Sequence, residues 1–139
     1  MLITLIFTAC NTTQKLNCEN KIHINTDSWK IDLAQTEQEQ RQGLMNIESM
    51  PENKGMLFIF EDEKKQAFWM KNTLIPLDII WINSNYEIIH IETAEPCTSE
   101  PCKIYTPTEN AKYVLEINAG LTEQKNIELG MKTKLELCN

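Results

Sequence analysis

Apolar and polar residues alternate along much of the chain, which is the pattern of strands that bury one face. Lys21–Asn25 and Trp29–Leu33 alternate in this way, and Thr26-Asp27-Ser28 between them favours a turn, so a hairpin is predicted. Gly55–Phe60 is apolar at almost every position, which is typical of a strand covered on both faces. Further strands are predicted at Ala67–Met70, Leu77–Asn83, Tyr86–Ala94, Lys112–Asn118 and Met131–Leu137.

Two short helical segments interrupt the strands. Thr36 and Glu39 have the spacing of a capping box, in which the Thr hydroxyl and the Glu carboxylate each bind a backbone N–H. A helix is therefore predicted from this point to about Leu44, with Gly43 near its end as a residue that tolerates left-handed backbone. Thr122–Asn126 predicts a helical turn.

The segments between these elements are polar or rich in Pro. Loops are predicted at Pro51–Lys54, at Glu61–Gln66 as a charged hairpin loop, at Asn83-Ser84-Asn85, and at Glu95–Thr108. Many short strands with one or two short helices predict a compact α+β domain that is mainly β, either a partly closed barrel or a sandwich. A chain of 139 residues is long enough for one such domain with its own core, which we place at residues 21–138.

Charge restricts the partners of the chain. The formal net charge is −7, whereas a surface that binds nucleic acid is basic, so nucleic acid is not an expected partner. The acidic residues are scattered, which is typical of a solvated surface. Twelve of the thirteen basic residues are Lys, and the single Arg41 is therefore a candidate for a site that needs a planar bidentate group.

The first ten residues resemble the end of a bacterial lipoprotein signal. The apolar run is too short to span a bilayer, and Phe7-Thr8-Ala9-Cys10 has the small residues and the cysteine of a processing box. Residues 1–9 are predicted to be a signal remnant, with a true start that lies upstream, and the polar residues 10–20 a tether. Lipid on Cys10 would then hold the domain on the extracytoplasmic side of a membrane. The alternative is a buried first strand.

Export also accounts for the other cysteines. Cys18, Cys97, Cys102 and Cys138 remain once Cys10 is lipidated, and an even number in an oxidising compartment predicts two disulfides. Pairing Cys97 with Cys102 closes a short loop and leaves Cys18 and Cys138 to join the ends of the domain, the most economical of three pairings. Zinc is the alternative for the close pair, but the spacing is poor for zinc and no His lies nearby.

A group of polar residues, Lys71-Asn72-Thr73, stands between apolar strands. Polar groups in such a place must be satisfied by hydrogen bonds, so they either brace a tight turn or form a binding site. Asn72 and Thr73 are frequent turn formers, and Lys71 is either an exposed lysine or a ligand-binding cation. Both interpretations remain open.

Asp78 and Glu116 lie within apolar strand segments. A carboxylate at the start of an apolar strand is expected to be paired or hydrogen-bonded, and this makes Asp78 a site candidate. Glu116 is either similar or turned to solvent, and Arg41 either binds an anionic ligand or pairs with one of these two carboxylates. The candidate ligand-binding residues are therefore Arg41, Lys71, Asn72, Thr73, Asp78 and Glu116.

Several short motifs follow one another in a recognisable order. They are Gly43-Leu44-Met45, Gly55-Met56-Leu57-Phe58-Ile59-Phe60, Phe68-Trp69-Met70-Lys71-Asn72-Thr73, Ile75-Pro76-Leu77-Asp78, Tyr113-Val114-Leu115-Glu116, and Ala119-Gly120 with Gly130. Over about residues 22–137 the chain resembles the domain of unknown function 192 family. The resemblance implies a compact β-rich domain, often exported or lipid-anchored, without an established activity. The chain departs from the pattern at Asn46, where a basic residue is common, and at Met131, where an acidic residue is frequent.

Three functions are compatible with these features. The leading hypothesis is a non-catalytic, lipid-anchored extracytoplasmic domain that binds a small molecule, a glycan or a protein and is itself a monomer. The second is a hydrolase in which Asp78 and Glu116 form the carboxylate pair of a glycosidase and Arg41 clamps an anion. The third is a purely structural module of the cell envelope.

No cofactor or metal is expected. Met45, Met56 and Met70 have thioethers that suit Cu(I), but Met on strands usually fills the core. His23 and His90 are isolated, with no second ligand at helical or hairpin spacing.

Overall fold

The structure, a computed structural model, describes residues 18–138. The elements in chain order are β1 (Lys21–Ile24), β2 (Asp27–Ala34), α1 (Glu37–Gln42), β3 (Lys54–Lys64), β4 (Phe68–Trp69), β5 (Leu77–Ile82), β6 (Ile88–Ala94), β7 (Ile104–Tyr105), β8 (Ala111–Asn118), α2 (Leu121–Gln124) and β9 (Thr133–Glu136). The predicted α+β domain that is mainly β is therefore confirmed.

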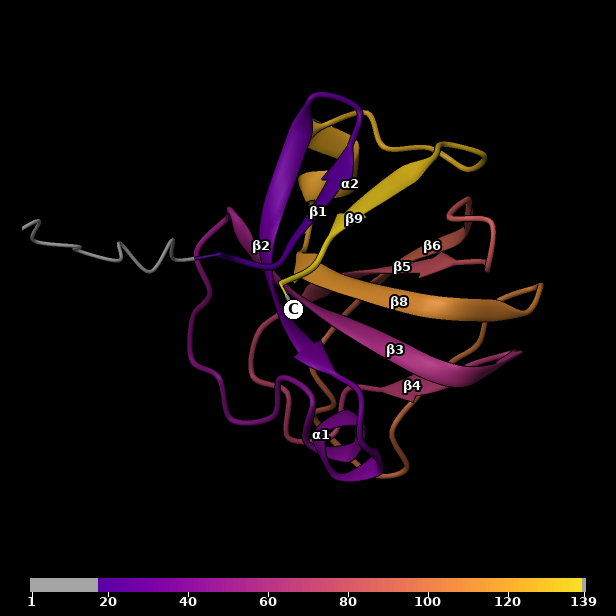
Figure 1. Cartoon of the computed structure of the whole chain (residues 1–139). Coiled ribbons are helices and arrows are strands. Elements are labelled where there is room, and N and C mark those ends of the chain that lie inside the picture. Colours follow the sequence, from indigo (N-terminus) through magenta and orange to yellow (C-terminus); the bar gives the residue numbers. More distant parts are fainter. Residues whose placement is uncertain (1–17, 139) are drawn as a thin grey trace, which may run out of the picture.

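Seven of the strands form one curled sheet in the order β6-β5-β8-β3-β2-β1-β9, and β4 and β7 form a separate two-stranded ribbon. Strands β2 and β3 run parallel, while the other neighbours in the large sheet are antiparallel. The sheet curls into a half-barrel, in which β1, β2 and β9 turn away from the layer formed by β3, β5, β6 and β8 (Figure 1). This geometry confirms the predicted partly closed barrel.

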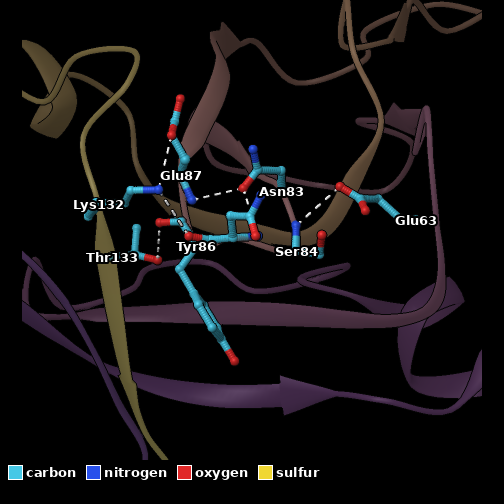
Figure 2. Close-up of polar contacts among 8 residues, drawn as sticks. Glu63, Asn83, Ser84, Tyr86, Glu87, Lys132 and Thr133 are labelled. Carbon is cyan, nitrogen blue, oxygen red and sulfur yellow. Dashed lines mark hydrogen bonds and ion pairs between the residues drawn. The ribbon is translucent and has the colours of Figure 1, made fainter.

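The two edge strands, β6 and β9, meet at one end of the half-barrel. The turn before β6 is fixed by the Asn83 side chain, which accepts a hydrogen bond from the Glu87 N–H at 3.0 Å (Figure 2). The chain entering β9 binds the same turn: Thr133 donates both its N–H and its hydroxyl to the Tyr86 carbonyl, and Lys132 Nζ lies 3.0 Å from the Glu87 carboxylate. A β-bridge between Glu87 and Lys132 completes the closure.

Hydrophobic residues cover both faces of the large sheet. The face packed against α2, called here the α2 face, carries a cluster that includes Ile22, Trp29, Leu57, Ile80, Leu115, Ile117 and Leu121. The opposite face lies toward the segment after α1 and the β4–β7 ribbon, and is called here the α1 face. Its cluster includes Leu44, Phe58, Met70, Ile79, Trp81, Tyr105 and Val114. Every residue of β5 is buried because this strand lies between β6 and β8 and is covered on both faces.

Several elements differ from the predictions by one or more residues, and three of the differences change which segments are strands or turns. The predicted loop at Glu61–Gln66 is wrong, because β3 continues to Lys64. Strand β2 ends at Ala34, opposite Phe58, so the far end of β3 pairs with β8 alone and its charged side chains stay exposed. The first turn begins one residue earlier than predicted, at Asn25 with φ of 54°. Strand β7 was not predicted, since two residues within a Pro-rich segment show no period.

Candidate functional site

A cavity of about 370 Å³ opens on the α1 face of the sheet. It is bounded by α1, the loop that follows this helix, β3, β4 and one residue of β8, and Figure 1 shows α1 and β4 at the same end of the half-barrel. Its lining consists of Glu37, Gln40, Arg41, Gln42, Gly43, Leu44, Met45, Phe58, Phe60, Ala67, Phe68, Trp69, Thr73 and Glu116. Segments far apart in the sequence therefore form one concave surface.

Hydrogen bonds hold α1 over this face, although the helix buries none of its own residues. The predicted capping box is confirmed: the Thr36 hydroxyl accepts from the Glu39 N–H at 3.2 Å, and the Glu39 carboxylate accepts from the Thr36 N–H at 2.9 Å. The Gln40 amide donates to the carbonyls of Ala34 (3.3 Å) and Ile59 (2.9 Å), which ties the helix to β2 and β3. The sheet thus positions the helical wall of the cavity.

Gly43 ends the helix and lets the chain pass close to an aromatic floor. Its φ of 45° is in a region that residues with a Cβ avoid, and an added Cβ would lie 3.3 Å from the Phe58 ring. The Phe68 ring packs edge-on against the rings of Phe58 and Phe60, with centroids 4.9 and 6.2 Å apart. The floor of the cavity is therefore apolar and well packed.

Glu116 supplies a carboxyl group to this apolar surface. It is paired with Met56 of β3 and Ile79 of β5, so the three side chains lie on one face of the sheet. Glu116 is only 4% exposed. Within residues 18–138 no fully covered side-chain N or O atom lacks a partner, so its carboxyl keeps access to the cavity that it lines.

Burial also changes the acidity of Glu116. Desolvation raises the pKa of this carboxyl from 4.5 to about 8, because a poorly solvated site disfavours the charged form. No hydrogen bond or charge from the described residues opposes the shift. The group is thus mainly a neutral carboxylic acid at pH 7.

Asp78 lies on the opposite face of the sheet. It is paired with Ile117, the neighbour of Glu116, and successive residues of a strand point to opposite faces. Asp78 is fully buried and accepts hydrogen bonds from the Thr93 hydroxyl (2.6 Å), the Thr122 N–H (2.9 Å) and the Thr122 hydroxyl (2.8 Å). The carboxylate pair predicted for a hydrolase is therefore not formed, and Asp78 anchors α2 instead.

Arg41 reaches the cavity but does not contact either buried carboxyl. Its guanidinium lies 3.0 Å from the Glu37 carboxylate, one helical turn earlier, and both side chains are at least 80% exposed. The alternative in which Arg41 pairs with Asp78 or Glu116 is wrong, because the helix directs this side chain to its solvent side. An exposed pair of this kind adds little to stability.

The polar group Lys71-Asn72-Thr73 is divided between two places. Thr73 lines the cavity, and its hydroxyl donates to the Lys71 carbonyl at 3.3 Å. Asn72 has a φ of 53°, and its carbonyl accepts a hydrogen bond from the Asn46 N–H, as expected of a turn former. Lys71 contacts Glu100 at 3.3 Å, beside the Cys97–Cys102 loop. Of the six candidate residues, the cavity therefore brings together Arg41, Thr73 and Glu116.

Both predicted disulfides are confirmed. Cys97 and Cys102 close their own loop, and Cys18 and Cys138, which are 120 residues apart, join the two ends of the described chain. Cys10 and the predicted signal remnant lie outside the described residues. Within residues 18–138, no helix has the length and apolar character needed to cross a bilayer.

Possible metal ligands are dispersed. Across the described part of the chain, no three His, Cys, Asp or Glu side chains lie close enough together to hold an ion. His23 contacts Glu136 at 3.1 Å, and His90 contacts Glu92 at 3.0 Å. Met70 is buried in the cluster on the α1 face.

Sequence comparison places this domain among known proteins. The model of the DUF192 family, described as "Uncharacterized ACR", matches residues 19–135. The chain belongs to this family. A UPF0127 protein of Thermococcus gammatolerans is 29% identical over 102 residues, and one of Thermococcus kodakarensis is 27% identical over 103 residues. These alignments cover 72% and 73% of the chain and 62% and 61% of the relatives, so the chain matches about three fifths of their length.

Two solved structures share the fold of this DUF192 domain. A protein of unknown function from Novosphingobium aromaticivorans is 30% identical, with a TM-score of 0.75 over 84% of this chain and 83% of that chain. A proposed transcription regulator from Sinorhizobium meliloti is 32% identical, with a TM-score of 0.76 over 85% of this chain and 92% of that chain. These likenesses support the fold and name no ligand or reaction.

The motifs that carry the DUF192 resemblance meet at the cavity. Gly43-Leu44-Met45 forms its rim, Phe58 and Phe68 its floor, and Thr73 and Glu116 its polar positions. Phe60 and Trp69 belong to the same motifs, and sequence reasoning missed the other lining residues, namely Glu37, Gln40, Gln42 and Ala67. Their best signal is the proximity of most of them to the motifs, since apolar strand residues and polar helix residues are individually unremarkable.

Proposed function

We propose that this DUF192 domain is a non-catalytic binding domain whose small-molecule ligand occupies the cavity on the α1 face. The observation that carries the proposal is Glu116, a side chain that is 4% exposed, lines the cavity, and is desolvated without a compensating hydrogen bond from the described residues. A polar group buried in this way destabilises a fold unless a partner satisfies it. A ligand in the cavity is such a partner.

The size and chemistry of the cavity support the same proposal. A volume of about 370 Å³ lies within the range of roughly 300–1,000 Å³ that is typical of small-molecule sites. Binding sites are commonly apolar surfaces with a few placed polar groups, and here Phe58, Phe60 and Phe68 supply the surface while Thr73 and Glu116 supply polar groups.

An NMR fragment screen of the oxidised, 15N-labelled protein tests the proposal. We expect the fragments that bind to shift backbone resonances of Met45, Phe68, Thr73 and Glu116 together, because these residues line one cavity. Met45→Trp fills the opening with an indole and is expected to reduce the affinity of such fragments at least tenfold.

The matched control is Leu129→Trp, which adds the same side chain at a position that is 62% exposed and outside the cavity lining. It is expected to bind like the parent. Binding that Met45→Trp leaves unchanged, or fragments that shift only scattered surface resonances, would contradict the proposal and favour a purely structural module.

The domain is further proposed to act outside the cytoplasm, held to a membrane by lipid on Cys10. The two disulfides support this location, since disulfides persist in oxidising compartments. The acyl chains of a processed lipoprotein supply the membrane affinity that a chain of net charge −7 lacks toward anionic lipid.

Detergent partitioning of the protein produced in a bacterial host with its native N-terminal segment tests the anchor. The parent is expected in the Triton X-114 phase and Cys10→Ala in the aqueous phase, because the lipid attaches to the Cys10 thiol. Mass spectrometry of the parent should show a diacylated or triacylated N-terminal cysteine. An unmodified Cys10, with parent and variant both in the aqueous phase, would contradict the anchor.

A further inference from the structure

The charged side chains that line the cavity do not all have a partner of opposite charge. Its lining holds two carboxyls, Glu37 and Glu116, and one guanidinium, Arg41, while the other lining residues are uncharged. Arg41 and Glu37 contact each other at 3.0 Å near the solvent, so their charges cancel locally. Lys71 lies outside the cavity, where Glu100 compensates its charge. Glu116 is thus the lining group whose negative charge, once formed, has no partner among the described residues.

The elements packed against Glu116 do not provide a cation either. Its two strand neighbours on the same face are Met56 and Ile79. The residues of β3 and β4 that line the cavity are apolar or aromatic, and Thr73 is neutral. Arg41 is the one basic side chain of the lining, and it is directed to Glu37. Among residues 18–138, no basic side chain is thus placed to neutralise an ionised Glu116, and a bound cation would do so.

The aromatic walls are compatible with a positive ligand. Phenyl and indole faces carry negative potential and attract cations, most strongly when water is excluded. The Trp69 ring, which lines the cavity, already has the Lys71 ammonium 5.2 Å from its centroid. The net charge of −7 also favours the approach of cations over anions.

We infer that the ligand of this cavity is an organic cation with N–H donors, an ammonium, amidinium or guanidinium ion, whose charge meets the Glu116 carboxylate and whose apolar body lies against the Phe side chains. This inference rests on the proposed function and specifies the chemistry of that site. Binding is coupled to ionisation: the Glu116 carboxylic acid loses its proton to solvent, and the carboxylate accepts hydrogen bonds from the ligand.

Three probes that share one shape and differ in charge test the inference: benzamidinium (cation), benzamide (neutral) and benzoate (anion). Calorimetric titration and NMR shifts on the oxidised protein give the affinity and the place of binding. At pH 9 we expect benzamidinium to bind at the cavity at least tenfold more tightly than benzamide, with benzoate weakest. Because the pKa of Glu116 is about 8, the affinity for benzamidinium should rise roughly tenfold from pH 7 to pH 9, and binding at pH 7 should release close to one proton.

Glu116→Gln is expected to abolish both the preference for the cation and its dependence on pH. The matched control is Glu48→Gln, which removes an exposed carboxylate outside the cavity lining. Because that group is solvated, the control should change the affinity less than threefold.

The outcomes separate this inference from the proposed function. Equal or tighter cavity binding by benzamide or benzoate would overturn the organic cation and leave small-molecule binding intact. Cavity binding by benzamidinium that Glu116→Gln does not weaken would also overturn it, since the carboxylate would not be the counter-ion. Absence of benzamidinium binding would overturn it as well, and the fragment screen with Met45→Trp then decides whether the cavity binds any ligand.

Discussion

Replacing Asp78 with Ala should lower the free energy of unfolding by about 3 kcal/mol or more. The carboxylate is fully buried and accepts hydrogen bonds from the Thr93 hydroxyl and from the N–H and hydroxyl of Thr122. Without it, the two donors of the buried Thr122 lose their acceptor, and each unsatisfied group costs about 1–3 kcal/mol. The first turn of α2 would also lose its connection to the sheet.

Urea unfolding of the oxidised protein, followed by the fluorescence of the buried Trp29 and Trp81, measures this loss. Asp78→Asn keeps the size and one acceptor oxygen and should fall between the parent and the Ala variant. Arg41→Ala is the charged control, because its side chain belongs to an exposed pair, and it should change the stability by less than about 0.5 kcal/mol. An Asp78→Ala variant as stable as the parent would contradict the bracing role.

The elements of the fold follow largely from short-range patterns. Alternation, apolar runs and the Thr36–Glu39 capping box depend on neighbours a few residues apart, and the structure contains the elements they predict. Pairing depends on residues far apart and leaves a weaker trace. The charged end of β3, Glu61–Lys64, resembles a loop in sequence, yet it is a strand because β8 pairs with it while β2 has already ended.

The site was predictable only in its chemistry. Asp78 and Glu116 are both carboxylates in apolar strands and are equally good candidates from sequence. A register in which Asp78 pairs with Ile117 rather than with Glu116 sends them to opposite faces, where one anchors α2 and the other lines the cavity. Phe60 and Phe68 belong to the family motifs, but nothing in the sequence marks them as the floor of a cavity, because apolar strand residues usually pack a core.

Glu116 should make the protein less stable as the pH rises. The pKa of a glutamate is 4.5 in the unfolded chain, and burial raises it to about 8 in the folded protein. Below pH 4.5 the carboxyl is protonated in both the folded and the unfolded state. The folded protein therefore carries no buried charge at Glu116 and loses no stability there. Between pH 4.5 and pH 8 unfolding releases a proton, and the stability is progressively lost. The pKa difference corresponds to a loss of up to about 5 kcal/mol, complete above pH 8.

Glu116→Gln removes the titrating group, so the stability of this variant relative to the parent should depend on pH. We expect the difference in unfolding free energy between variant and parent to be flat below pH 4.5, to rise up to about 5 kcal/mol by pH 8, and then to level off. Urea titrations from pH 4 to pH 9 measure it, and the contributions of other groups, such as Glu39, cancel because both proteins contain them.

Glu37→Gln serves as the matched variant, since it removes an exposed carboxylate of the same cavity and should give no such rise. A flat difference for Glu116→Gln would mean that Glu116 is solvated like an ordinary carboxylate, and the case for a ligand at this position would lose its main support. A rise of the expected size would show that Glu116 and Asp78 have opposite effects on the stability of the fold. Asp78 would then stabilise the fold, while Glu116 would be retained although the fold is more stable without its charge, which is the behaviour of a group kept for binding rather than for folding.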